Sequence, residues 1–233
     1  MTEQTKNGTA TIAPKAADAP TKTAEDVRHI TIPHLDMGQA RLHVVGITPF
    51  IMHKWSEKAA KQIEDKVTGK AKAQRGARDP EQDWKDAAYV IPGKEDLPDW
   101  KPGKYFQPAA MYKHAFLYGV GQIDDVKTFP KTKATGWFFV DRGDPVLQFD
   151  SCELRFDMGR NPTQPIYRPM FSDWSTELDI SYNANAITLE QVVALLDLGG
   201  FAGGIGEWRP SSPKNKSGSF GRFRVARVIT SDR

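Results

Sequence analysis

The residues best suited to chemistry lie in a glycine-rich, basic stretch near the end of the chain, residues 199–225, GGFAGGIGEWRPSSPKNKSGSFGRFRV. Glycine lets a backbone approach an anion closely, and successive backbone N–H groups can form a concave phosphate site. Lysine and arginine side chains add positive charge, and Trp208 offers a surface on which bases can stack. We therefore predict nucleic-acid contacts by Gly204, Gly206, Trp208, Arg209, Lys214, Lys216, Gly218, Gly221, Arg222 and Arg224. The competing interpretation is a flexible connection between a helix and a strand.

The basic residues of the chain gather in two blocks, although its formal net charge is only +3. The first basic block, residues 54–78, has eight Lys or Arg against three acids, and the second, residues 207–233, has seven against two. Clusters of one charge in a nearly neutral protein favour a surface that faces a polyanion. The alternative is a solvated helix face and a solvated tail.

Histidines are the other groups that could do chemistry. His114 stands beside Tyr112 and Lys113, and His53 stands beside Lys54. Either group could serve as general acid and base in a metal-independent ribonuclease. His29 and His34 fit no strong metal-binding spacing, and no GxSxG nucleophile motif occurs. We expect a protein that is not an enzyme and that has no metal and no cofactor, with a ribonuclease as the enzymatic alternative.

Composition narrows the class of protein further. Cys152 is the one cysteine, so no internal disulfide can form. No apolar run approaches the roughly 20 residues needed to cross a bilayer, and the start of the chain lacks the apolar centre of a signal peptide. These features predict a cytoplasmic protein with no membrane contact.

Periodicity and turn residues predict a mixed order of strands and helices. The strands are expected at 40–47, 136–140, 175–183 and 221–229, with two short ones between 146 and 156. The helices are expected at 55–75, 80–89, 108–120 and from Thr188, which forms a capping-box pattern with Gln191. The order predicts an α+β fold with a split βαβ core of the ferredoxin or RRM type.

The same pattern divides the chain into regions. Residues 1–27 are rich in Thr, Ala, Lys and Pro and are predicted to form a disordered arm. Residues 28–233 are predicted to form a single domain. A helical insertion is expected at about 52–103, and a β-rich arm at about 144–172.

Three segments carry a resemblance to a known family. Thr48–Ile51 reads TPFI after the first strand, Pro108–Ala115 opens a helix as PAAMYKHA, and GIG at Gly204–Gly206 precedes GSFGR at Gly218–Arg222. Their order and character resemble the motifs of the RAMP superfamily, the ferredoxin-fold RNA-binding subunits of CRISPR effector complexes. Alanines replace the usual hydroxyl–glycine pair before the helix. The chain is also similar to bacteriophage and prophage proteins that end in GxGEWRP…GxFGxF.

The resemblance implies a function and a set of contacts. Lys113 and Arg222 would face a nucleic-acid backbone, Lys54 would join them after the first strand, and the glycine-rich stretch would hold the strand. Backbone subunits of this superfamily stack side by side along one strand, with a β-arm touching the neighbour. We thus expect a phage-type protein that binds single-stranded RNA or DNA in the bacterial cytoplasm as a homo-oligomer or filament. The alternatives are an endoribonuclease of related fold and a structural or host-interacting phage protein.

Overall fold

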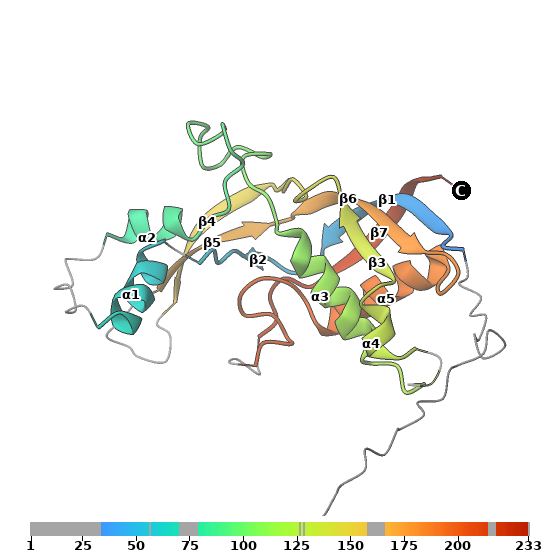
Figure 1. The fold of residues 1–233 in the computed structure, drawn as a ribbon. Helices are drawn as coiled ribbons and strands as arrows, with labels where there is room; N and C mark the ends of the chain where they lie inside the picture. Colours follow the sequence, from blue (N-terminus) through green and yellow to red (C-terminus); the bar gives the residue numbers. More distant parts are fainter. Residues whose placement is uncertain are drawn as a thin grey trace, which may run out of the picture. The chain divides into compact units, whose positions relative to one another are not determined.

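The computed structural model describes residues 34–55, 57–69, 79–125, 127, 129–157, 166–213 and 218–232. The predicted disordered arm, residues 1–27, lies outside the described residues. Leu35–Arg233 form one compact unit. This unit is mixed α+β with antiparallel sheets (Figure 1).

Strand β1 (Met37–Gly46) is an inner strand of the larger sheet, and its alternate residues Ala40, Leu42 and Val44 form one buried face. It pairs antiparallel with β6 (Ser175–Asn183) on one side and β7 (Phe223–Asp232) on the other. Strand β3 (Phe138–Asp141) pairs antiparallel with β6. The strand order is therefore β3-β6-β1-β7.

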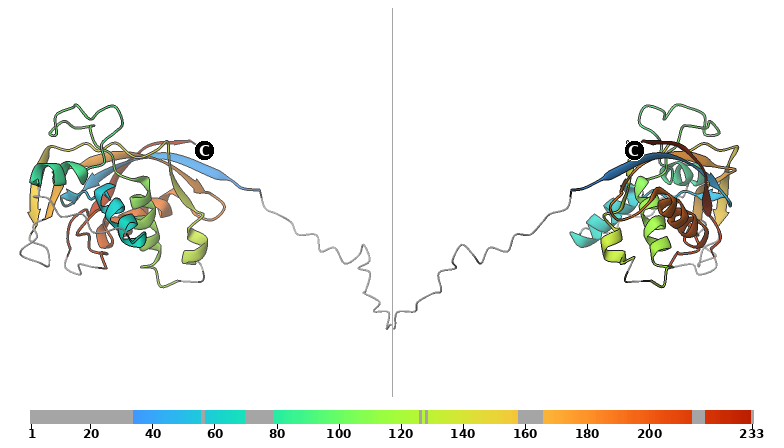
Figure 2. Two further views of the ribbon diagram at one scale, coloured as in Figure 1. Left: turned by 60° about the vertical axis from the view of Figure 1, so that its left-hand side comes forward. Right: turned by 90° about the vertical axis from the view of Figure 1, so that its right-hand side faces the viewer.

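Helices α3 (Ala109–Val120) and α5 (Leu189–Ala202) lie on one face of this sheet (Figures 1 and 2). The predicted capping box at Thr188 and Gln191 is confirmed, since each side chain bonds the other residue's backbone N–H. Val192, Leu195 and Leu196 of α5 are buried against the sheet and α3. The opposite face of the sheet carries polar residues, such as Arg41, which donates to Asp179 at 2.8 and 2.9 Å.

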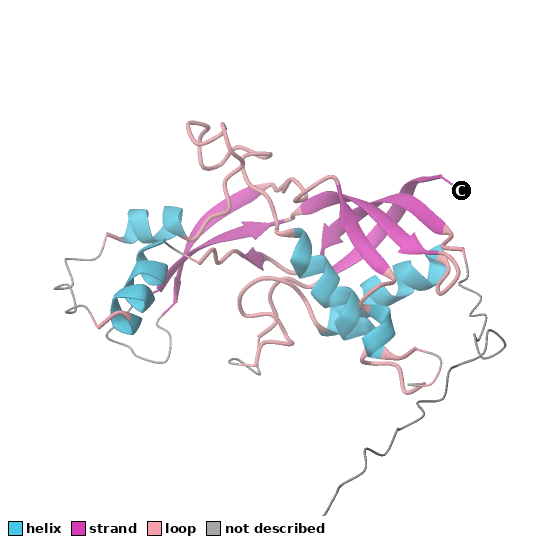
Figure 3. Ribbon diagram, in the orientation of Figure 1, coloured by secondary structure: helices cyan, strands magenta, loops and turns pink. Residues whose placement is uncertain are grey.

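A second, smaller sheet has the order β2-β5-β4 (Figure 3). Its strands are β2 (Phe50–Ile51), β4 (Ser151–Asp157) and β5 (Ile166–Ser172), so β4 and β5 form an antiparallel pair inside the range expected for the arm. Helices α1 (Glu57–Val67) and α2 (Pro80–Asp86) fall inside the range expected for the insertion. A short helix, α4 (Lys131–Ala134), precedes β3.

Several local predictions were wrong. The helix predicted at 55–75 begins later, and Trp55 precedes it with 62% of its surface exposed. Of the two strands predicted between 146 and 156, only β4 forms, because Val146 and Gln148 make single bridges to different partners, Phe106 and Ser175. Strand β2 was not predicted, since its pairing partner Met170–Phe171 is more than a hundred residues away in sequence. Strand β5 was predicted only as part of the β-rich arm, without its own bounds.

Aromatic side chains dominate the buried core between the sheets and helices. Phe171 of the small sheet lies 4.9 Å from Phe149 and 5.1 Å from Tyr105, measured between ring centroids. Phe116 of α3 stacks on Phe138 of β3 at 4.8 Å. Among the described residues, no helix is long and apolar enough to cross a membrane.

Candidate nucleic-acid interface

The glycine-rich loop, residues 203–222, is anchored to strand β2 by its own backbone. Residues 214–217, including the predicted contacts Lys214 and Lys216, lie outside the described residues. Glu207 N–H donates to Ile51 O at 2.9 Å, and Gly221 N–H donates to Pro49 O at 2.8 Å. Ile205 N–H donates to Gly221 O at 2.9 Å and closes the loop on itself. Many of the backbone donors expected to cradle a phosphate are thus used within the protein.

The glycines of this loop make room for the protein's own backbone. A Cβ atom at Gly221 would lie 1.8 Å from Ile205 O, and one at Gly218 would lie 2.2 Å from Trp208 O. A Cβ atom at Gly206 would lie 2.5 Å from Ile51 O. Gly204, Gly206 and Gly221 also have positive φ, which glycine adopts readily. Internal packing alone therefore accounts for glycine at these positions.

The predicted cations of the loop are distributed over different surroundings. Arg209 is half-buried and donates to Gly206 O at 2.9 Å and to Ser211 Oγ at 3.1 Å, so it braces the loop from inside. Arg222 Nε donates to Phe201 O at 3.2 Å, and its guanidinium lies 4.0 Å from the Phe201 ring centroid. Arg224 is exposed on β7 and pairs in register with Val45. Trp208 is half-buried, with φ of 60°.

A charged cluster joins the loop to β5 and to the segment that follows β2. Arg168 of β5 donates from Nε to Glu207 Oε2 at 2.9 Å, and its Nη2 lies 3.1 Å from His53 Nε2. Arginine can only donate, so a neutral His53 accepts at Nε2 and carries its proton on Nδ1, whereas a protonated ring would bring a second cation to Glu207. That Nδ1 faces Glu207 Oε2 at 3.4 Å. The charges of Arg168 and Glu207 compensate each other. Sequence spacing could not have revealed this cluster, because its three residues come from three separate segments.

The Glu207 carboxylate holds the loop in place, so we expect the free energy of unfolding to depend on the protonation of Glu207. Burial raises the pKa of Glu207, but hydrogen bonds and charge from His53 and Arg168 outweigh burial and hold the pKa below its ordinary value. A depressed pKa stabilises the fold above the ordinary glutamate value of about 4.3, and this stability is lost as pH falls through the folded-state value. We expect Glu207→Gln to lower the free energy of unfolding at pH 7 by roughly 1–3 kcal/mol.

Denaturant unfolding across pH 3 to 8 measures this effect. The difference between native protein and Glu207→Gln should be full at neutral pH and should close below the ordinary glutamate range. Glu177→Gln is the matched control, because Glu177 is exposed and its oxygen lies 3.9 Å from Arg41. A pH-independent difference would contradict the role given to Glu207.

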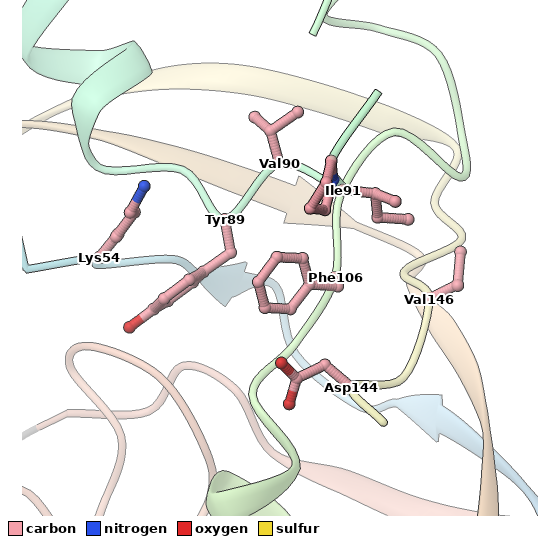
Figure 4. Close-up of a pocket in the computed structure, with 8 residues that line it drawn as sticks. Lys54, Tyr89, Val90, Ile91, Phe106, Asp144 and Val146 are labelled. Atoms are coloured by element: carbon pink, nitrogen blue, oxygen red, sulfur yellow. The ribbon is translucent and has the colours of Figure 1, made fainter. Parts of the chain in front are cut away.

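The segment that follows β2 is exposed beside this cluster. Lys54 and Trp55 are both exposed, and Lys54 N–H donates to Ala87 O at 2.8 Å, which fixes the backbone there. Lys54 also lines a pocket of about 490 Å³ together with Tyr89, Phe106 and Asp144 (Figure 4). Its ammonium has no ion-pair partner among the residues the structure describes.

The three residues of the alternative catalytic site, Tyr112, Lys113 and His114, do not meet at one place. Tyr112 is fully buried and donates its hydroxyl to Gln107 Oε1 at 2.5 Å, and burial raises the pKa of Tyr112 well above its ordinary value. Lys113 donates to the carbonyls of Thr135 and Phe138. His114 is exposed. Consecutive helical residues point about 100° apart, which is why these three neighbours face different surroundings.

Lys113 was also predicted to contact a phosphate, but its ammonium is engaged by contacts within the protein. Besides the two carbonyls, its Nζ stands 3.7 Å from the centroid of the Phe139 ring. Burial lowers the pKa of Lys113. The side chain thus ties α3 to the start of β3.

Within the described part of the chain, no cluster of three or more His, Cys, Asp or Glu could hold a metal ion. The comparisons with known proteins add no assignment. No protein-family model matches the chain, and no curated protein matches it significantly.

Proposed function

We propose that this protein binds single-stranded nucleic acid where the segment His53–Trp55 meets the glycine-rich loop. The observation that carries the proposal is the meeting of the two basic blocks, which are more than a hundred residues apart in sequence. The bonds from Glu207 to Ile51 and from Gly221 to Pro49 hold the second block against β2. The first block begins three residues after Ile51, at Lys54. Cationic side chains drawn together from distant parts of a chain favour a polyanion.

The topology of the larger sheet supports a ferredoxin-like or RRM-like core. Counted along the chain, β1, β3, β6 and β7 alternate with α3 and α5 as two split βαβ units. Their spatial order β3-β6-β1-β7 and the position of both helices on one face fit that architecture. Such cores carry many functions, so the fold is compatible with the proposal without selecting it.

The exposed side chains at this surface suit binding without sequence selection. Lys54 can neutralise a phosphate, and the neighbouring Trp55 exposes a ring on which any base can stack. Arg222 adds a guanidinium that lies 4.0 Å from the centroid of the Phe201 ring. These groups contact features that RNA and DNA share.

Salt dependence tests the proposal. Labelled single strands of RNA and DNA should bind with an affinity that falls steeply as salt rises. Each lost phosphate contact lowers the slope of log K against log salt by about 0.7 for single strands. We therefore expect Lys54→Ala with Arg222→Ala to weaken binding and to lower the slope by about 1.4. Fluorescence anisotropy at four or more salt concentrations measures both effects.

A second double variant removes the same charge elsewhere. Lys131 and Lys133 are exposed on α4, so Lys131→Ala with Lys133→Ala should keep the native slope. Equal losses in both variants would show that the loop junction is not the site. Absent or salt-independent binding would remove the proposed function. A stable oligomer that ignores added oligonucleotide would favour the structural or host-interacting alternative.

The proposal includes assembly side by side along the strand. The antiparallel β4–β5 pair supports it, since a paired hairpin is a suitable arm for contacting a neighbouring copy. Light scattering during the same titrations reports assembly, because the mass of the complex should then rise stepwise with strand length. A one-to-one complex on long strands would contradict assembly.

A further inference from the structure

We propose that the 490 Å³ pocket beside Lys54 holds one base of the bound strand, an inference that rests on the proposed function. The pocket is lined by Lys54, Tyr89, Val90, Ile91, Pro92, Phe106, Asp144 and Val146. Its volume lies within the roughly 300–1,000 Å³ of small-molecule sites. Its lining combines aromatic rings for stacking on a base, one cation for a phosphate and one carboxylate that can accept from a base N–H.

Two aromatic rings form the wall of the pocket. Tyr89 and Phe106 lie 5.3 Å apart between ring centroids, tilted by 50°, and both are half-buried (Figure 4). Their backbones are fixed, since Phe106 N–H donates to Tyr89 O at 3.0 Å and Tyr89 N–H donates to Met52 Sδ at 2.9 Å. A ring held in place loses little entropy when a base stacks on it.

The polar groups stand at the margins of this wall. Lys54 supplies a cation for the phosphate of the bound nucleotide. The Asp144 carboxylate accepts from Ala109 N–H at 2.8 Å, which fixes it at the start of α3, and a carboxylate has further lone pairs for an N–H of a base. Burial and the Asp144 charge raise the pKa of Tyr89, so its hydroxyl stays protonated and can donate.

This combination favours a nucleotide over other small ligands. A purely apolar ligand would leave the Lys54 cation and the remaining lone pairs of Asp144 unused, and a simple anion would leave the two rings unused. Every base has an aromatic face and at least one N–H donor. The pocket therefore orients a base without selecting its identity, in agreement with sequence-tolerant binding.

Strands with and without bases test the inference. An oligonucleotide should bind more tightly than an abasic strand of equal length and charge, by about 5- to 150-fold for each base stacked. In Tyr89→Leu with Phe106→Leu, the contribution of this pocket to that advantage should disappear, while affinity for the abasic strand and the salt slope stay native. Trp100→Leu is the control, because Trp100 is 69% exposed and does not line the pocket. It should retain the full advantage.

A second variant tests the pocket without the two leucine substitutions, which could themselves disturb folding. Val146 is exposed, so Val146→Trp fills the pocket without opening the core, and it should reduce the advantage of the normal strand in the same way. If both pocket variants keep the full advantage, the inference is wrong while the proposed function stands. If no strand binds at all, the proposed function fails, and adenosine monophosphate then tests the pocket alone by ligand-observed NMR. Binding of this probe that is lost in both pocket variants would support the pocket, and no binding would overturn it.

Discussion

Replacing Gly199 by alanine is expected to lower the free energy of unfolding by about 3 kcal/mol or more. Gly199 lies in α5 where that helix crosses α3, and an added Cβ atom would stand 1.8 Å from Ala115 O. The contact is with backbone, so no side chain can rotate away, and the two helices must separate. Separation would weaken packing around Phe116 and Leu195, which are buried beside the crossing.

Thermal and denaturant unfolding measure this loss. The opposite helix offers an independent variant, since a Cβ atom at Gly119 would stand 2.2 Å from Leu195 O, and Gly119→Ala should destabilise similarly. Gly136→Ala is the control, because its Cβ atom would have Lys133 O at an ordinary 3.7 Å. A Gly199→Ala protein as stable as the Gly136→Ala protein would contradict the close helix crossing.

Replacing Gly221 by alanine should be the most damaging single change within the glycine-rich loop. Gly221 has φ of 66°, and its Cβ atom would lie 1.8 Å from Ile205 O. Both the left-handed backbone and the closure between Ile205 and Gly221 must then yield. Backbone strain costs about 1–2 kcal/mol, and overpacking adds about 1–3 kcal/mol more.

A glycine with positive φ and free space separates these two causes. Gly143 has φ of 91° and no atom within 4 Å of its added Cβ, so Gly143→Ala should show the strain alone. Hydrogen exchange should show faster opening around Glu207 and Gly221 in Gly221→Ala, because their N–H groups bond Ile51 of β2 and Pro49 just before it. Equal unfolding free energies for the two variants would mean that the loop does not pack as described.

These expectations change what the glycine-rich stretch says about function. As a sequence, glycines between lysines and arginines indicated a backbone that contacts a phosphate closely. In the structure, Gly206, Gly218 and Gly221 pack closely against the backbone of the protein itself. The loop is thus a packed scaffold, and the groups it leaves for a ligand are side chains around its anchor, such as Lys54 and Arg222.

Local sequence determined the elements whose signals lie within one element. Thr188 and Gln191 cap α5, and the alternation of Leu178, Ile180 and Tyr182 defines β6, because these interactions and periodicities need no distant partner. The mixed α+β character follows from the same signals. Strand β2 has only two residues and exists through Met170 and Phe171 of β5, so no local pattern could reveal it.

The grouping of chemical side chains was decided by the tertiary structure alone. Sequence adjacency suggested that Tyr112, Lys113 and His114 act together. Helical geometry instead buries Tyr112 in the core, directs Lys113 to the carbonyls of Thr135 and Phe138, and leaves His114 exposed. The fold instead joins His53, Arg168 and Glu207, and it places Tyr89 and Phe106 beside Lys54. The sequence by itself determined which residues carry charge and aromatic surface. Their meeting depends on backbone bonds between distant strands and loops, a kind of contact that no local spacing encodes.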